Sequence, residues 1–282
     1  MTDAETVVLD THLPYPMFKR GKVRDIYDMG DRLLIVSTDR ISAFDVILPN
    51  GIPRKGEALT RLSTHWFQQT KNIIQNHMIK TVDPRTVIVK KTKLIPIEFI
   101  IRGYLYGSAW EDYKQEKPIC GITLQKGLKK AEKLDRPILT PATKAEKGHD
   151  MEITQKDVEQ EIGKATATQI EEVSMKIYAK ASKQAEENGI IVADTKLEFG
   201  TIGRELILID ELLTPDSSRF WPLDTYKIGE DQPSFDKQYV RDYLISIKWN
   251  KQPPAPTLPP NVIEGTSKKY VEAYERLTGR KF

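Results

Sequence analysis

Apolar and polar residues alternate with a period of two through much of the first hundred positions, a pattern typical of β-strands. The segments with this pattern are KVRDIYD, RLLIVST, FDVILP and RTVIVKKT, which occupy 22–28, 32–38, 44–49 and 85–92. The Met29-Gly30-Asp31 turn between the first two predicts a hairpin. We therefore expect the N-terminal third to be rich in antiparallel strands.

Helical spacing of apolar residues predicts one helix at 57–71 and two more near 235–246 and 267–278. Three pairs with the spacing of a capping box predict further helix starts, namely Ser108 with Glu111, Thr154 with Asp157, and Thr168 with Glu171. The last of these helices should stop at Asn188-Gly189. The polar stretch 121–150 is expected to be a long loop, and QPPAPTLPPNV an extended connector.

Two apolar segments in the second half of the chain end in acidic residues. IIVA leads into DTKLEFG at 194–200, and ELILI is followed by Asp210. If 199–202 and 206–209 pair through a three-residue loop, Glu198 lies opposite Asp210. Their Cβ atoms would then be about 4.5–5.5 Å apart, which suits a shared Mg²⁺ and predicts repulsion without one. Lys196 would lie on the same side, placed to neutralise a phosphate in transfer.

Composition limits the classes of function. The chain has 282 residues, 39% of them hydrophobic, so it can bury a large core. The 43 Lys and Arg exceed the 40 Asp and Glu by only +3, which gives no global charge to recruit nucleic acid or a membrane. With one cysteine, no signal-peptide pattern and no apolar run near ~20 residues, we expect a cytoplasmic protein with small-molecule substrates. A monomer is slightly favoured over an oligomer.

The segment KRGKVRD at 19–25 predicts a phosphate-binding hairpin. Gly21 permits close backbone approach, and Lys19, Lys22 and Arg24 supply positive charge. A basic hairpin followed by an acid-ended hairpin is also the order found in protein kinases. We therefore predict a two-lobed α+β fold, similar to kinases and ATP-grasp enzymes. Residues 1–97 would form an antiparallel β lobe and 98–282 a larger α/β lobe, with ATP in the cleft between them.

Several segments, taken in order, resemble the signature segments of the SAICAR synthetase family of purine-biosynthesis enzymes. The two most specific are LIPIEFIIRGYLYGS at 94–108 and VADTKLEFG at 192–200. The others are KRGKVRDIYD, the stretch 37–67, TPATKAEKGHD, LIDELLTPDSSRFW and QPSFDKQYVRDYL. Because the similarity extends from about residue 15 to 250, it is more than one shared motif.

This resemblance implies a reaction and its cofactors. Members of the family join L-aspartate to the carboxylate of carboxyaminoimidazole ribotide, converting ATP to ADP and phosphate in the presence of Mg²⁺. Because a carboxylate is a poor acceptor for an amine, we expect ATP to phosphorylate it first. His149 is one candidate base for the aspartate amine, and a solvent-facing or structural role is the alternative.

The resemblance also assigns residue roles, position by position. The nucleotide phosphates are matched by Lys22 with Arg24, and adenine by backbone groups of the hinge 97–101, which includes Glu98 and Ile100. The Mg²⁺ ligands are Glu198 and Asp210. The catalytic positions are Lys196, Asp194, Lys144 and Asp150. The ribotide-binding positions are Arg102, Ser108, Ser217, Ser218, Arg219 and Arg241. Independently of the family, Ser108 as a helix cap beside Arg102 would make an anion site.

Two other classes of function account for part of these residues. A kinase-like phosphotransferase would use Lys22, Lys196, Glu198 and Asp210 but has no need of the ribotide set. A phosphate- or RNA-binding protein would use the basic loops, although near-neutral charge and the lack of clustered aromatics disfavour it. ADP release that requires both L-aspartate and the ribotide separates the ligase from these alternatives.

Overall fold

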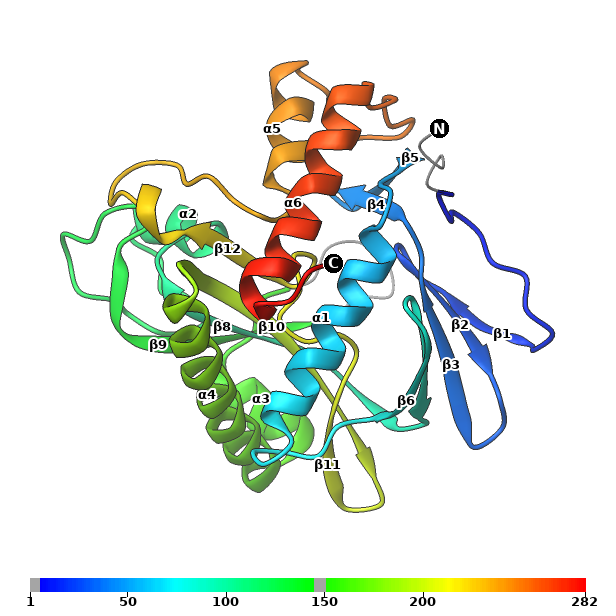
Figure 1. The fold of residues 1–282 in the computed structure, drawn as a ribbon. Coiled ribbons are helices and arrows are strands. Elements are labelled where there is room, and N and C mark those ends of the chain that lie inside the picture. The colour runs from blue at the N-terminus through cyan, green and yellow to red at the C-terminus, as the bar shows by residue number, and fades with distance from the viewer. Residues whose placement is uncertain (1–5, 145–150) are drawn as a thin grey trace.

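The computed structural model describes residues 6–144 and 151–282, which form two five-stranded antiparallel sheets with helices packed around them (Figure 1). The strands are β1 Met17–Arg20, β2 Arg24–Asp28, β3 Arg32–Ser37, β4 Arg40–Ala43, β5 Val46–Gly51, β6 Met78–Asp83, β7 Thr86–Lys90, β8 Lys93–Tyr104, β9 Lys133–Thr143, β10 Ile190–Ile202, β11 Glu205–Ile209 and β12 Ser218–Pro222. The helices are α1 Lys55–Thr70, α2 Ser108–Lys114, α3 Gln155–Ile162, α4 Lys164–Glu187, α5 Gln238–Ser246 and α6 Pro260–Thr278, with a short 3₁₀ turn at Leu223–Thr225.

The first sheet has the order β1-β2-β3-β7-β6 and comes entirely from the N-terminal third. The predicted hairpin is its centre, with Tyr27 opposite Leu34. Because residues alternate across a strand, the two faces bury separate clusters, one around Tyr27 and Leu34 and one around Ile35 and Val87. The predicted β-rich N-terminal region is therefore confirmed.

The second sheet has the order β11-β10-β8-β9, and β12 pairs with the first half of β10. Strand β8 lies between β10 and β9, and β10 is 13 residues long. Its first half consists of IIVA and its second half of the acidic segment DTKLEFG. The two expected segments are thus one continuous strand.

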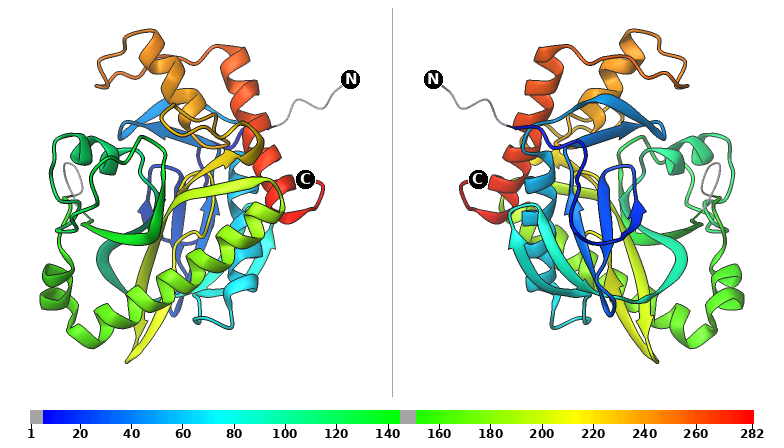
Figure 2. Two further views of the ribbon diagram at one scale, coloured as in Figure 1. Left: turned by 90° about the vertical axis from the view of Figure 1, so that its left-hand side faces the viewer. Right: turned by 90° about the vertical axis from the view of Figure 1, so that its right-hand side faces the viewer.

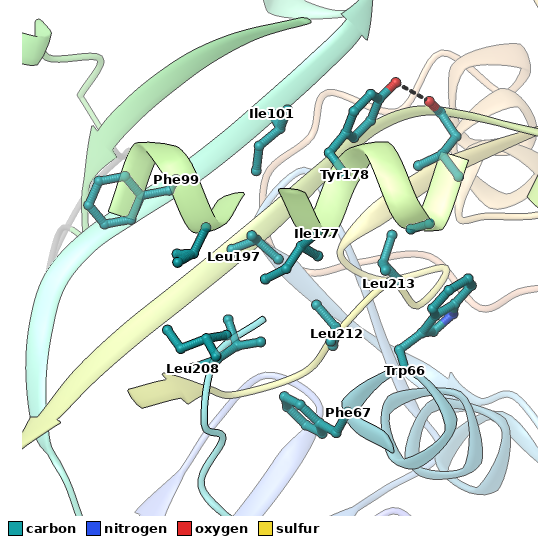
Figure 3. Packing of buried hydrophobic residues seen from close by; sticks show 14 of the residues in the cluster. Trp66, Phe67, Phe99, Ile101, Ile177, Tyr178, Leu197, Leu208, Leu212 and Leu213 are labelled. Carbon is teal, nitrogen blue, oxygen red and sulfur yellow. Dashed lines mark hydrogen bonds between the residues drawn. The ribbon is translucent and has the colours of Figure 1, made fainter. Parts of the chain in front are cut away.

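One face of this second sheet is covered by α4, which runs across it in Figure 2. Odd-numbered residues of β8 from 95 to 101, and Leu197 and Phe199 of β10, point into the core there, and Phe99 and Leu197 are fully buried. The rings of Phe99 and Phe199 meet edge to face at 5.6 Å. Before the register shift between Val192 and Asp194, the core residues of β10 are even-numbered, and the hydroxyl of Tyr178 on α4 donates to the Val192 carbonyl at 2.6 Å (Figure 3). From Asp194 to Glu198 the even-numbered side chains of β10 project to the other side of the sheet, as do those of β8.

The C-terminal helices pack against N-terminal elements. α6 lies along α1 (Figure 1), and a cluster around Ile41, Leu48, Val240 and Val262 joins the two-stranded β4–β5 sheet to α5 and α6. The two-lobed, antiparallel α+β architecture is confirmed. The chain passes from the first sheet to the second at 91–92, so the expected lobe boundary at 97 falls inside β8.

Other expectations differ in detail from the structure. The expected loop 121–150 contains β9, which lies at the edge of its sheet, where prolines such as Pro137 and Pro141 are tolerated. α4 begins at Lys164 rather than at Thr168, directly after Gly163, whose φ of 82° ends α3. The last helix begins at Pro260 rather than near 267, because proline suits the first turn of a helix.

The helix starts predicted at 57 and 154 are confirmed to within a few residues. α1 spans Lys55–Thr70, and Thr154 with Asp157 forms a capping box at α3. Among the described helices, none is long and apolar enough to cross a membrane.

We expect Phe99→Ala to lower the free energy of unfolding by about 3–5 kcal/mol, because it opens a cavity beneath the polar face of the sheet. Leu94→Ala on the same strand is the matched control, since Leu94 is 44% exposed, and it should cost less than about 1 kcal/mol. Urea unfolding measures both. Equal losses in the two variants would contradict the assignment of the core face.

Candidate active site

One face of the second sheet carries most of the charged residues that the sequence singles out. The register places Arg102 opposite Asp194 and Glu98 opposite Glu198, across β8 and β10. Side chains two residues apart share a face, so Lys196 projects from the same surface. The sheet therefore separates an apolar core on one side from a charged surface on the other.

Lys196 lies between two carboxylates on this surface. Its Nζ is 2.7 Å from Glu98 Oε1 and 2.8 Å from Glu198 Oε1, and Lys144 Nζ donates to Glu198 Oε2. Burial disfavours the charged form of Lys196, but Glu198, Asp210 and Glu98 together raise its pKa above the ordinary value. Lys196 is therefore protonated at neutral pH. Lys144, one of the predicted catalytic positions, contacts Glu198.

Arg24 of β2 connects the first sheet to the acids of the second. Its Nη1 is 2.9 Å from Asp210 Oδ1, and its Nη2 is 2.5 Å from Glu211 Oε2. Burial alone would raise the pKa of Asp210, but Arg24, Lys196 and Lys144 lower it well below its usual range. Asp210 is therefore ionised at neutral pH and neutralised by cations from both sheets.

The predicted pairing of Glu198 with Asp210 is wrong. The β10–β11 turn has two loop residues, 203–204, rather than three, so Glu198 lies opposite Ile209. On its other side it faces Glu98 of β8. Each carboxylate has its own cations, which counter the repulsion expected between Glu198 and Asp210 without a metal.

The two acids still act on a common neighbour, since both raise the pKa of Lys196. No three His, Cys, Asp or Glu side chains group as a metal cage within residues 6–144 and 151–282. Glu198 and Asp210 nevertheless fit Mg²⁺, which takes one or two carboxylates and completes its shell with water and phosphate oxygens. The donor set suits a metal that arrives with a nucleotide rather than a resident structural ion.

A cavity of about 200 Å³ lies on the same face of the sheet, next to Lys196. Four cations and three carboxylates line it: Arg102, Lys196, Arg219 and Arg241 with Asp194, Asp216 and Asp236. The cations exceed the carboxylates by one positive charge. The cavity is therefore suited to an anionic ligand.

Arg102 is fixed in this cavity by neutral hydroxyls. Its Nε is 2.9 Å from Thr140 Oγ1, and its Nη2 is 3.1 Å from Ser108 Oγ. The predicted proximity of Arg102 and Ser108 is confirmed, but Ser108 caps no helix. The N-cap of α2 is Gly107, which has a φ of 62° and gives no side-chain cap. The hydroxyl of Ser108 therefore orients an arginine instead of a helix end.

Arg219 projects from β12 toward Asp194, with which it forms an ion pair. Its guanidinium lies 5.7 Å from the centre of the Tyr106 ring, in cation–π geometry. Within the described part of the chain, the buried Nε of Arg219 has no hydrogen-bond partner. The ion pair with Asp194 and the Tyr106 ring therefore hold this guanidinium at the wall of the cavity.

Ser217 lies in the turn that precedes β12, and Ser218 is the first residue of that strand. Ser218 Oγ lies 2.8 Å from the Thr195 hydroxyl, and Ser217 Oγ accepts from the Thr214 amide at 3.2 Å. Both residues line the cavity, but both hydroxyls are engaged within the protein. Arg241 lines the cavity from α5. Burial raises the pKa of Asp236 in the same cavity, and the charge of Arg241 opposes that shift.

Of the predicted phosphate-binding residues, only Arg24 points at the acids. Lys19 is exposed, and Lys22 is exposed and pairs with Asp45. The amide of Gly21 donates to the Arg24 carbonyl at 2.7 Å, which closes the turn between β1 and β2. Binding of nucleotide phosphates by this hairpin stays a prediction.

The expected adenine contact through backbone groups of 97–101 stays a prediction. Glu98 and Ile100 are paired with β10 along one edge and with β9 along the other, whereas the pairing with β10 is interrupted between Leu94 and Glu98. A backbone group that is engaged in the ladder cannot also bind a base. The Glu98 side chain instead accepts from Lys196, and Ile100 lines the arginine cavity.

Sequence reasoning missed several buried polar residues of the site, which are Lys55, Thr140, Glu211, Asp216 and Asp236. Two of them could have been recognised from the sequence, because Glu211 directly follows Asp210 and Asp216 lies in the segment LLTPDSSR. The predicted catalytic Asp150 and the candidate base His149 lie outside the described residues.

The family model and the sequence relatives indicate the same family. The family model described as SAICAR synthetase matches residues 17–256. A phosphoribosylaminoimidazole-succinocarboxamide synthase of Thermodesulfovibrio yellowstonii is 51% identical, covering 97% of this chain and 99% of the relative. The enzyme of the same name from Geobacter sulfurreducens is also 51% identical, covering 97% and 98%.

Solved structures agree with the sequence relatives. The SAICAR-synthase of Saccharomyces cerevisiae, complexed with SAICAR, superposes with a TM-score of 0.91 at 41% identity, covering 98% of this chain and 99% of that one. A SAICAR synthetase in complex with ADP has a TM-score of 0.73 at 25% identity, covering 94% and 98%. With a family model that spans most of the chain and relatives at half identity, the chain belongs to the SAICAR synthetase family.

Proposed function

We propose that this chain is an ATP-dependent, amide-forming ligase that joins L-aspartate to the carboxylate of carboxyaminoimidazole ribotide. The products would be SAICAR, ADP and phosphate, as part of purine biosynthesis. The observation that carries the proposal is the arginine cavity beside the Lys196 acid cluster on one sheet face. A relative bound to SAICAR and another bound to ADP support the same ligands.

The acid cluster suits the phosphoryl-transfer half of this reaction. Glu198 and Asp210 would hold Mg²⁺, which neutralises charge on the transferring phosphate when it is bound. Arg24 and Lys144 pair with these acids, and with Mg²⁺ bound there they would be available to bind the triphosphate. Lys196 stays protonated because carboxylates surround it, so it can stabilise the γ-phosphoryl group.

The arginine cavity suits the ribotide half. Arg219 and Arg102 would bind its phosphate, while Asp194 orients both guanidiniums from the neighbouring strand. The ribotide carboxylate would then lie beside Lys196, which lines the same cavity. An oxygen of the ribotide carboxylate attacks the γ-phosphorus of ATP, and ADP leaves. The aspartate amine next attacks the acyl carbon, and phosphate leaves with the former carboxylate oxygen.

ADP release at the full rate should require all three substrates. With the purified chain, we expect fast ADP formation from Mg-ATP when both L-aspartate and the ribotide are present, at most slow formation with the ribotide alone, and none without the ribotide. A coupled ADP assay measures this directly. ADP formation at the same rate without the ribotide would contradict the proposal and favour a kinase-like or idle hydrolytic activity.

Arg219→Ala should weaken ribotide binding and leave ATP binding nearly intact. Loss of charge-assisted hydrogen bonds worth about 2–4 kcal/mol raises the KM for the ribotide by about 30- to 1000-fold. Arg136→Ala is the control, since Arg136 is an exposed arginine that lines a separate groove. Steady-state kinetics in each substrate decide the outcome. Equal weakening of the ribotide and ATP would overturn the assignment of the cavity.

Asp210→Asn should lower turnover by at least about 100-fold, because it removes a charged metal ligand without changing size. Melting in EDTA should also occur at a lower temperature, because buried Arg24 loses one counter-charge. Glu211→Gln is the matched control, since it removes the other carboxylate charge that pairs with Arg24. It should lower the melting temperature with a much smaller loss of turnover. Equal losses of turnover would mean that Asp210 acts through Arg24 and not through a metal.

A further inference from the structure

The turn 214–218, which leads into Arg219, is anchored by one buried carboxylate. Asp216 Oδ2 accepts from Lys55 Nζ at 2.7 Å, and Asp216 Oδ1 accepts from the Tyr270 hydroxyl at 2.6 Å. Lys237 Nζ lies 3.4 Å from the same carboxylate. Both oxygens of Asp216 are therefore held, and the residue itself lines the arginine cavity.

The two groups that hydrogen-bond to Asp216 come from helices that lie outside the second sheet. Lys55 begins α1 and Tyr270 belongs to α6, and both are 0% exposed. Burial lowers the pKa of Lys55, and Asp216 opposes that shift as its closest counter-charge. A buried ammonium is costly unless it is paired, so this contact fixes the position of the turn on α1.

The turn 214–218 connects Asp216 both to the acid cluster and to the arginine cavity. Thr214 donates through Oγ1 to Glu211 Oε2 at 2.6 Å, next to Asp210. The amides of Ser217 and Ser218 donate to the Thr214 carbonyl at 3.1 and 2.8 Å. Any displacement of Asp216 would therefore move the backbone that carries Arg219.

We propose that Lys55 and Tyr270 are positioning residues, which act through Asp216 to hold the turn 214–218 and thereby aim Arg219 into the anion-binding cavity. The identity of the ligand rests on the proposed function, but the anchoring does not. Tyr270 lies beyond residue 256, where the match to the family model ends. The C-terminal helix of this chain thus contributes to the geometry of the site without touching the substrate.

Tyr270→Phe tests the proposal because it removes only the hydroxyl and keeps the buried ring. Its KM for the ribotide should rise about tenfold, while the KM for ATP stays within about twofold. Tyr274→Phe is the matched control, one helical turn further along, where the ring packs on Phe282 instead. This control should change neither constant.

Hydrogen exchange in the absence of substrates gives a readout that is independent of the reaction. Amides of a peptide spanning 211–220 should exchange several-fold faster in Tyr270→Phe than in the parent or in Tyr274→Phe. Lys55→Met should show the same change more strongly, and Tyr270→Phe alone decides if that variant does not fold. Faster exchange confined to α6, or an unchanged ribotide KM in an active enzyme, overturns the positioning role. An inactive parent with faster exchange at 211–220 overturns the proposed function and leaves the anchoring intact.

Discussion

Neutralisation of buried carboxylates is the constraint on which the rest of the site depends. Glu98, Glu198, Asp210, Glu211 and Asp216 are all largely withdrawn from water, and each is met by a lysine or arginine. An unpaired charge in such a place would cost several kcal/mol, so the folded site exists only as a network of opposite charges. Under the proposed function, the lysines and arginines of the same network would meet the phosphate charge of the ligands.

The sheet turns this constraint into a spatial order. Because side chains alternate across β8 and β10, a single stretch such as IEFIIR supplies both core residues and site residues. Phe99 and Ile101 pack under α4, whereas Glu98 and Arg102 lie on the charged face of the sheet. A one-residue slip would bury the charges and expose the core, so the register that stabilises the fold also fixes the distance between the arginine cavity and the acid cluster.

Sequence reasoning predicted local patterns well and long-range register poorly. Period-two alternation identified β2 and β3, and helical spacing identified α1, because both signals arise within a few residues. The opposition of Glu198 and Asp210 failed by one position, since the length of the 203–204 turn decides the register. Lys55 was missed because a lysine at a helix start is usually solvated. Only the distant Asp216 and Tyr270 explain its burial.

The central claim is that one sheet face holds the ribotide carboxylate against the γ-phosphate of ATP, so that the carboxylate is phosphorylated before the amine attacks. The most direct measurement uses ribotide labelled with ¹⁸O in its carboxylate, followed by mass spectrometry of the phosphate released. The account predicts one ¹⁸O atom in phosphate for each molecule of SAICAR formed. Unlabelled phosphate, released together with SAICAR, would contradict it.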